Sequence, residues 1–155
     1  MKKESLSIKE IQKKLEHYCA YQERSHKEVI KKLKEINIIP IAIDQIVSDL
    51  IQKNYLNENR FAKIFTKGKF RIKNWGKKRI IFELKRHQVS DYNIKNALQE
   101  ISETDYIETL NKLSKKVWKS SKGNILSKRK IKFISALQYR GWETDLIYDQ
   151  LNKME

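Results

Sequence analysis

The chain has 155 residues, of which 39% are apolar, and its 34 Lys and Arg residues exceed its 19 Asp and Glu residues, giving a formal net charge of +15. With only four glycines and one proline, it has few turn-forming residues for an all-β fold, so we expect an all-α protein. A charge of this size bears on partners rather than on the fold, and it favours a polyanion such as nucleic acid or a nucleoprotein.

Membrane proteins and enzymes can be set aside on the sequence. No apolar run approaches the 18 or more residues of a membrane-spanning helix, so we expect a cytoplasmic protein without a membrane partner. Cys19 is the only cysteine, which rules out an internal disulfide, and the three histidines have no metal-ligand spacing. The motifs of phosphate loops, nucleophile elbows and zinc proteases are absent, so we expect no catalysis, no metal and no cofactor.

The first third of the chain predicts three helices. Ser7-Ile8-Lys9-Glu10 is typical of a capping box, and apolar residues follow it at helical spacing until about residue 22. A second capping box at residues 25–28 begins a shorter helix. Asn37 suits the left-handed position after this helix, and Pro40 suits the first turn of a third one.

The fourth helix is predicted from Asn57, a favourable N-cap, to a break at residues 74–76. Its expected apolar face is Phe61, Ile64, Phe65 and Ile72. A basic stripe lies roughly a third of a turn away and consists of Arg60, Lys63, Lys67 and Arg71. Like charges four residues apart destabilise a helix by about 0.2–0.5 kcal/mol per pair. A polyanionic partner would explain the stripe, and the alternative is a solvated face in a Lys-rich protein.

Five further helices are predicted downstream. The fifth runs from Lys77 to a turn near residues 87–88, and serines at positions 90 and 102 cap the sixth and seventh. Residues 119–123 are the most loop-like segment. The eighth helix runs from Ser127 to a turn at residues 140–141, and the ninth follows it.

Apolar positions repeat along these helices. Five of them follow one another at offsets of 4, 5, 5 and 4 residues, and the register advances by 51 and then 53 residues. The three matched sets are Val29, Leu33, Ile38, Ile43 and Val47; Ile80, Leu84, Val89, Ile94 and Leu98; and Phe133, Leu137, Trp142, Ile147 and Leu151. We predict an elongated array of three tandem three-helix repeats, at residues 1–56, 57–102 and 103–155, each containing a helix-turn-helix-like pair.

Two segments resemble a known family. Tyr55-Leu56-Asn57-Glu58-Asn59-Arg60-Phe61-Ala62 is similar to the Y-L-[ND]-[DE]-x-R-F-A signature of the RecX family. Gly76-Lys77-Lys78-Arg79-Ile80, with Glu83-Leu84, resembles its G-x-x-[KR]-[IL]-x-x-E-L pattern. The resemblance covers roughly residues 15–153. It implies a regulator of the RecA recombinase that binds the groove of the RecA–single-stranded DNA filament. Such a regulator inhibits filament extension, ATP hydrolysis and strand exchange in DNA repair, recombination and the SOS response.

One turn departs from the family pattern. RecX proteins often have glycine in the turn after the repeat leucine, where this chain has Asn37, Gln88 and Gly141. Asparagine tolerates left-handed geometry, and glutamine does so less well. The sequence therefore leaves the shape of the second turn open.

Charge placement indicates which helices would meet the partner. The second helix of each pair carries acids such as Asp44, Asp91 and Asp145, which disfavours its insertion into the major groove of duplex DNA. Basic residues gather on the fourth, fifth, seventh and eighth helices instead. The predicted partner- and nucleic-acid-binding residues are Arg60, Lys63, Lys67, Lys69, Arg71, Lys73, Lys77, Lys78, Arg79, Lys119, Lys122, Lys128, Arg129 and Lys130.

The expected partners follow from the resemblance and from this charge. We expect a monomer that contacts the RecA filament and, through its basic residues, single- or double-stranded DNA. The alternative function is a helical module that binds nucleic acid directly and without RecA. Aromatic residues lie among the basic residues. We expect Trp142, a repeat position, in the core, whereas Phe70 has two alternatives: a position in the core, or a contact between repeats or with a partner.

Overall fold

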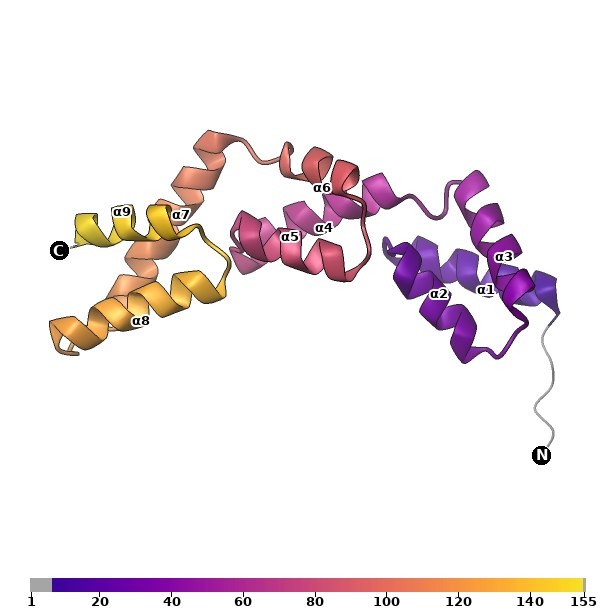
Figure 1. The fold of residues 1–155 in the computed structure, drawn as a ribbon, viewed down its shortest axis with the longest axis horizontal. Coiled ribbons are helices and arrows are strands. Elements are labelled where there is room, and N and C mark those ends of the chain that lie inside the picture. The colour runs from indigo at the N-terminus through magenta and orange to yellow at the C-terminus, as the bar shows by residue number, and fades with distance from the viewer. Residues whose placement is uncertain (1–6, 155) are drawn as a thin grey trace, which may run out of the picture.

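The computed structural model describes residues 7–154, and every regular element in that part of the chain is an α-helix (Figure 1). The helices are α1 (Ile8–Tyr21), α2 (His26–Glu35), α3 (Pro40–Gln52), α4 (Glu58–Lys73), α5 (Lys77–Arg86), α6 (Asp91–Leu98), α7 (Glu103–Ser120), α8 (Leu126–Tyr139) and α9 (Thr144–Met154). The most extensive helix–helix contacts all lie within α1–α3, α4–α6 or α7–α9. We call these the first, second and third units.

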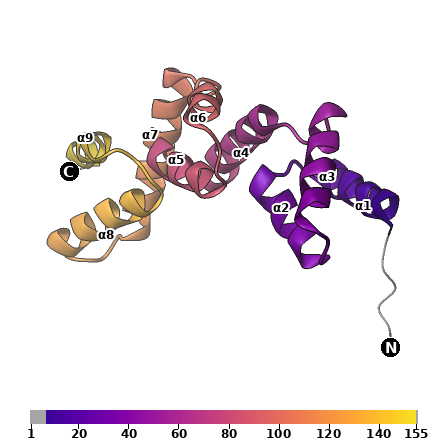
Figure 2. The same cartoon turned by 45° about the vertical axis from the view of Figure 1, so that its right-hand side comes forward.

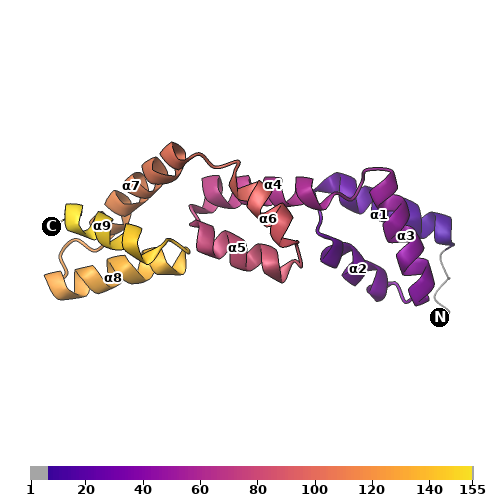
Figure 3. The same cartoon turned by 45° about the horizontal axis from the view of Figure 1, so that its top comes forward.

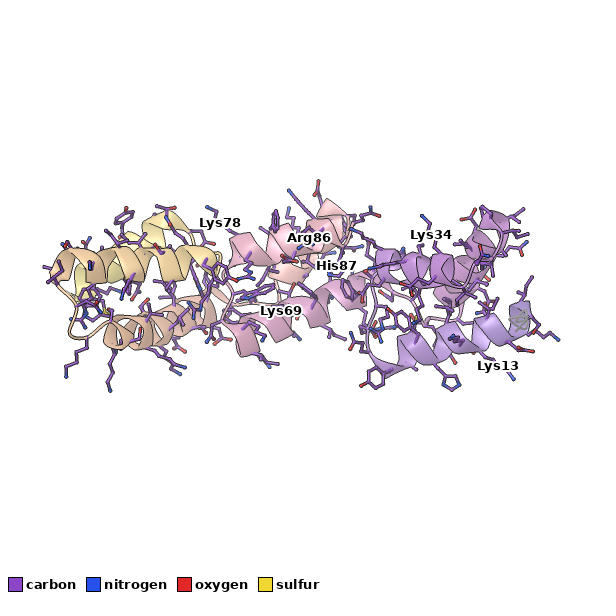
Figure 4. All side chains as sticks on the ribbon, turned by 90° about the horizontal axis from the view of Figure 1, so that it is seen from below. Lys13, Lys34, Lys69, Lys78, Arg86 and His87 are labelled. Carbon is purple, nitrogen blue, oxygen red and sulfur yellow. The ribbon has the colours of Figure 1, made fainter. Side chains whose placement is uncertain are left out.

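The fold is an elongated all-α array, with α1 and α9 at opposite ends (Figures 1 and 2). Equivalent helices of the three units line up. The second helices α2, α5 and α8 follow one another along one edge (Figure 3). Seen from below, the first helices α1, α4 and α7 form a row beside them, so these two rows share one face (Figure 4). The exact limits of the three repeats, at residues 1–56, 57–102 and 103–155, remain predictions. Residues 1–6 and 155 of these ranges lie outside the described part of the chain.

Helix ends form where the sequence predicts them. Ser25 and Glu28 make both bonds of a capping box, because the Glu28 amide donates to Ser25 Oγ and the Ser25 amide to Glu28 Oε1. At Ser7 the structure has one such bond, from the Glu10 amide. Asn57 caps α4, and Pro40 is the first residue of α3.

The turns between the paired helices share one backbone conformation. Asn37, Gln88 and Gly141 all have positive φ, at 62°, 60° and 86°. The open question at Gln88 is thus answered: glutamine takes the left-handed conformation that asparagine and glycine take in the other two units. The same turn geometry is therefore preserved despite three different residues.

The repeat positions supply the core. None of the fifteen is exposed, and Trp142 is 1% exposed, as predicted. The core of the first unit stands alone and includes Leu15, Cys19 and Leu33. The second and third units share a single larger core that runs from Phe61 to Leu151. The first unit is therefore the separate part of the array.

The predicted apolar face of α4 is partly wrong. Ile64 and Ile72 are 52% and 78% exposed, whereas Ala62, Thr66 and Phe70 are buried. The reason is that α4 packs on α6 with a rotated face, where small residues allow close approach. Phe70 combines its two alternatives: it is buried in the shared core, and its ring stacks across the junction on that of Tyr106 in α7 at 6.0 Å.

The two junctions between units differ in chemistry. Within the third unit, Tyr106 stacks on Trp142 at 4.5 Å, and across the junction Trp142 Nε1 donates to the carbonyl of Asn74 in the second unit at 3.0 Å. Backbone bonds from Gly76 N to the Arg140 carbonyl and from Lys78 N to the Gly141 carbonyl complete this contact. The first and second units meet through polar side chains, as where Lys27 Nζ donates to the Arg86 carbonyl at 2.8 Å.

Candidate polyanion-binding surface

The fourteen predicted binding residues fall into groups with different surroundings. All of them lie on α4, α5 and α8 or in the segments around the α7–α8 loop. First and second helices form the face seen in Figure 4, on which Lys69 and Lys78 are labelled. The surroundings of the other predicted residues follow from their contacts.

Arg60 joins the first two units. Its Nε donates to Glu23 Oε1 at 2.5 Å, and its Nη2 donates to the Asn54 carbonyl at 2.9 Å. These bonds bring the start of α4 against the loop that follows α1. Because its donors are used inside the protein, Arg60 holds the junction and offers little to a partner.

Lys63 and Lys67 of the basic stripe are paired within the second unit. Both ammonium groups reach the carboxylate of Glu100, at 3.4 and 3.5 Å, in the turn after α6. The hydrogen bond from Lys63 and the charge of Lys67 lower the pKa of Glu100. The sequence could not show this acid, which lies 33 residues or more along the chain from both lysines. The like-charge repulsion in α4 is thus offset by a tertiary ion pair, which weakens the case for a partner at these two positions.

Three other basic side chains lie over aromatic rings near the junction of the second and third units. Lys69 Nζ lies 5.1 Å from the Trp75 ring centroid, and the Arg79 guanidinium lies 4.2 Å from the same ring. Lys77 Nζ lies 4.6 Å from the Tyr106 ring. Arg79 also donates to the Tyr139 carbonyl at 3.0 Å. Cation–π contacts of this kind contribute about 0.5–1 kcal/mol at exposed sites. Lys77 and Arg79 thus help to join the two units, while the contact of Lys69 stays within the second unit.

Arg129 has a similar structural role in the third unit. Its guanidinium lies 3.9 Å from the Trp118 ring centroid and donates to the Trp118 carbonyl. It thereby closes the loop between α7 and α8. Lys130 is half-buried beside it.

Six of the predicted residues project into solvent. In the described part of the chain no ion pair is formed by any of their side chains, and we call them the outer basic set: Arg71, Lys73, Lys78, Lys119, Lys122 and Lys128. Their free charges make them the strongest candidates for contact with a polyanion.

Lys112 and Lys116 were not among the predicted residues, although they extend this surface. Both line a hollow with Asn74 and Thr109, where the end of α4 meets α7. Their spacing of four residues on α7 was visible in the sequence. Their position next to the end of α4 was not, because it depends on how the third unit docks.

Other kinds of site are not found in the described residues. Across residues 7–154, no three or more His, Cys, Asp or Glu side chains gather as a metal site requires. None of the helices in that range combines the length and apolarity needed to cross a bilayer.

Comparison with known proteins identifies the family. A family model described as "RecX, second three-helix domain" matches residues 57–98. The Regulatory protein RecX of Lactobacillus johnsonii is 31% identical over 142 residues, which cover 87% of this chain and 51% of that protein. The chain belongs to the RecX family. The Regulatory protein RecX of Listeria monocytogenes is 25% identical over 130 residues, covering 84% of this chain and 48% of the relative.

Solved RecX structures share the fold. The crystal structure of RecX from Lactobacillus salivarius superposes with a TM-score of 0.81 at 22% identity, covering 95% of this chain and 96% of that one. A crystal structure of regulatory protein RecX gives 0.84 at 19% identity, covering 94% and 73%. The chain spans about half the length of the curated relatives it matches. These relatives are named regulatory proteins.

Proposed function

We propose that this RecX-family chain regulates the RecA recombinase by binding in the groove of the RecA–single-stranded DNA filament. By occupying the groove it would restrain filament extension, ATP hydrolysis and strand exchange, and so act in DNA repair, recombination and the SOS response. It carries out no chemistry of its own in this proposal.

One observation carries the proposal most directly. Basic residues outnumber acidic ones on the first and second helices of the second and third units, which form the elongated face of Figure 4, while α3, α6 and α9 carry acids such as Asp44, Asp91 and Asp149. An elongated surface with an excess of positive charge suits an extended polyanion better than a compact one. We assign the contact with the partner to the outer basic set.

The test of this function is the DNA-dependent ATPase activity of RecA with stoichiometric amounts of the protein. We expect a lower rate, together with co-sedimentation of the protein on filaments. An unchanged rate without co-sedimentation would refute the proposal.

Direct nucleic-acid binding without RecA is the alternative outcome. If the protein neutralises about 6–10 phosphates, its affinity for bare DNA falls roughly 10³–10⁵-fold between 50 and 200 mM salt. We expect RecA to add affinity at a salt concentration where binding to bare DNA has gone. Equal binding with and without RecA would favour the alternative.

A further inference from the structure

The first unit has an open groove that the proposed function does not use. It runs along one face of α1 and the loop that follows, and it has a volume of about 610 Å³. It is lined by Lys14, His17, Tyr18, Ala20, Tyr21, Arg24 and Lys32. No carboxylate is among the lining residues, although the first unit as a whole carries many acids.

The cations of this groove are ordered around Tyr18. The Arg24 guanidinium lies 3.8 Å from the Tyr18 ring centroid, and its Nε donates to the Tyr18 carbonyl at 3.0 Å. Lys32 Nζ lies 5.6 Å from the same ring. Glu28 pairs with Arg24 at 3.8 Å, and it lines an adjoining hollow with Glu35. Negative charge thus lies at one end of the groove, so an anion is favoured at the α1 side, beside Lys14.

Tyr21 adds an unused aromatic surface. It is the last residue of α1 and is 84% exposed. In the described part of the chain its ring makes no contact with another aromatic ring, whereas Tyr18 is covered by two cations. A flat ring that stands in solvent beside cations is the arrangement on which nucleic-acid bases stack, because every base has a π-face.

We propose that this groove binds a short stretch of single-stranded nucleic acid, with a base on the Tyr21 ring and a phosphate beside Lys14. An acidic peptide would also pair with these cations. However, the apolar anchor side chain of a peptide needs an enclosed pocket, whereas Tyr21 offers only an exposed flat ring. The site lies on the first unit, apart from the outer basic set, and it requires no RecA.

The first experiment measures binding of a fluorescent oligothymidylate of about eight nucleotides by anisotropy at low salt, without RecA. Tyr21→Ser is expected to weaken binding about 5- to 100-fold, the loss that follows from removing one stacked base. Tyr21→Phe keeps the ring and should retain the affinity. Tyr92→Ser is the matched control, since Tyr92 is 73% exposed on α6.

A second measurement locates the contact. An oligonucleotide containing 5-bromodeoxyuridine is irradiated with the full chain, and adducts are mapped by mass spectrometry. We expect an adduct at Tyr21 that excess unlabelled oligothymidylate removes and an acidic, phenylalanine-containing peptide does not. Adducts confined to the second and third units, equal losses in both serine variants, or displacement by the peptide alone would each overturn the proposal. The RecA ATPase test is independent of all these outcomes.

Discussion

The backbones of Gly76 and Gly141 lie in direct contact, so that a β-carbon on Gly76 would be 2.4 Å from the Gly141 carbonyl oxygen. This contact allows the two backbone hydrogen bonds that join α5 to the turn before α9. It ties the second unit to the third through main-chain atoms, which cannot move aside as a flexible side chain can.

Gly76→Ala is therefore expected to destabilise the protein by about 1–3 kcal/mol, the usual cost of overpacking. The measurement is the free energy of unfolding in urea. Gly68→Ala is the matched control: nothing lies within 4 Å of a β-carbon there, and alanine is better than glycine by about 1 kcal/mol in a helix interior. Equal effects of both substitutions would show that the glycine contact is unimportant.

Much of this fold could be predicted from the sequence because helix caps and apolar spacing are local. Ser25, Asn37 and Pro40 act where the pattern placed them. The buried face of α4 could not be predicted. The helix has apolar residues on two faces, one with Ile64 and one with Phe70, and only its packing on α6 and α7 decides which face is buried.

The candidate site shows the same limit more strongly. The sequence indicates which helices are basic, but it does not show that Arg60 reaches Glu23 or that Lys63 and Lys67 share Glu100. Those partners come from distant parts of the chain. Whether a base is structural or available to a ligand is therefore decided by tertiary packing.

Arg60 and Arg71 should separate these two roles. Arg60→Met leaves the partly buried Glu23 carboxylate without its donor, and we expect a loss of about 1–3 kcal/mol in unfolding free energy. Arg71→Met removes an exposed charge and should change stability by at most about 0.5 kcal/mol. Urea unfolding checks both. A stable Arg60→Met protein would mean that the ion pair does not hold the junction.

The outer basic set should account for filament binding. Changing Arg71, Lys73 and Lys78 together to Gln is expected to weaken co-sedimentation with RecA filaments and to reduce its salt dependence, because fewer counterions are exchanged. The helical content measured by circular dichroism should hold, since glutamine has a similar helix propensity. The control triple is Lys9, Lys13 and Lys34 to Gln, from exposed positions of the first unit. Equal losses in both triples would mean that net charge alone attracts the partner.

Tyr106 should make stability fall at high pH. Burial, reinforced by the Glu143 carboxylate that accepts its hydrogen bond, raises the pKa of this phenol well above its ordinary value of 10.0. The folded protein keeps the proton while the unfolded chain releases it. Stability is thus complete below about pH 10 and declines above it, by up to about 1.4 kcal/mol per pH unit.

Tyr106→Phe removes this dependence. At pH 8 the variant should be less stable by about 1–3 kcal/mol, because the Lys77 amide loses its acceptor. The deficit should shrink as unfolding free energies are measured from pH 9 to pH 11. Tyr92→Phe, at an exposed position, should follow the wild-type profile. A constant difference across this range would contradict the assignment to Tyr106.

The two cores should unfold separately, and the chain carries a probe for each. Cys19 lies in the core of the first unit, where burial raises the pKa of its thiol to about 11, so it should react slowly with a thiol reagent at pH 8. Trp75, Trp118 and Trp142 all belong to the core that the second and third units share. Because the first core is smaller, thiol reactivity should rise at a lower urea concentration than the change in tryptophan fluorescence.

Gly76→Ala should lower only the urea midpoint of the fluorescence change, because the glycine contact lies outside the first unit. Superimposed transitions for both probes, in the wild type and in Gly76→Ala, would show one cooperative unit and would rule out the division at the polar junction.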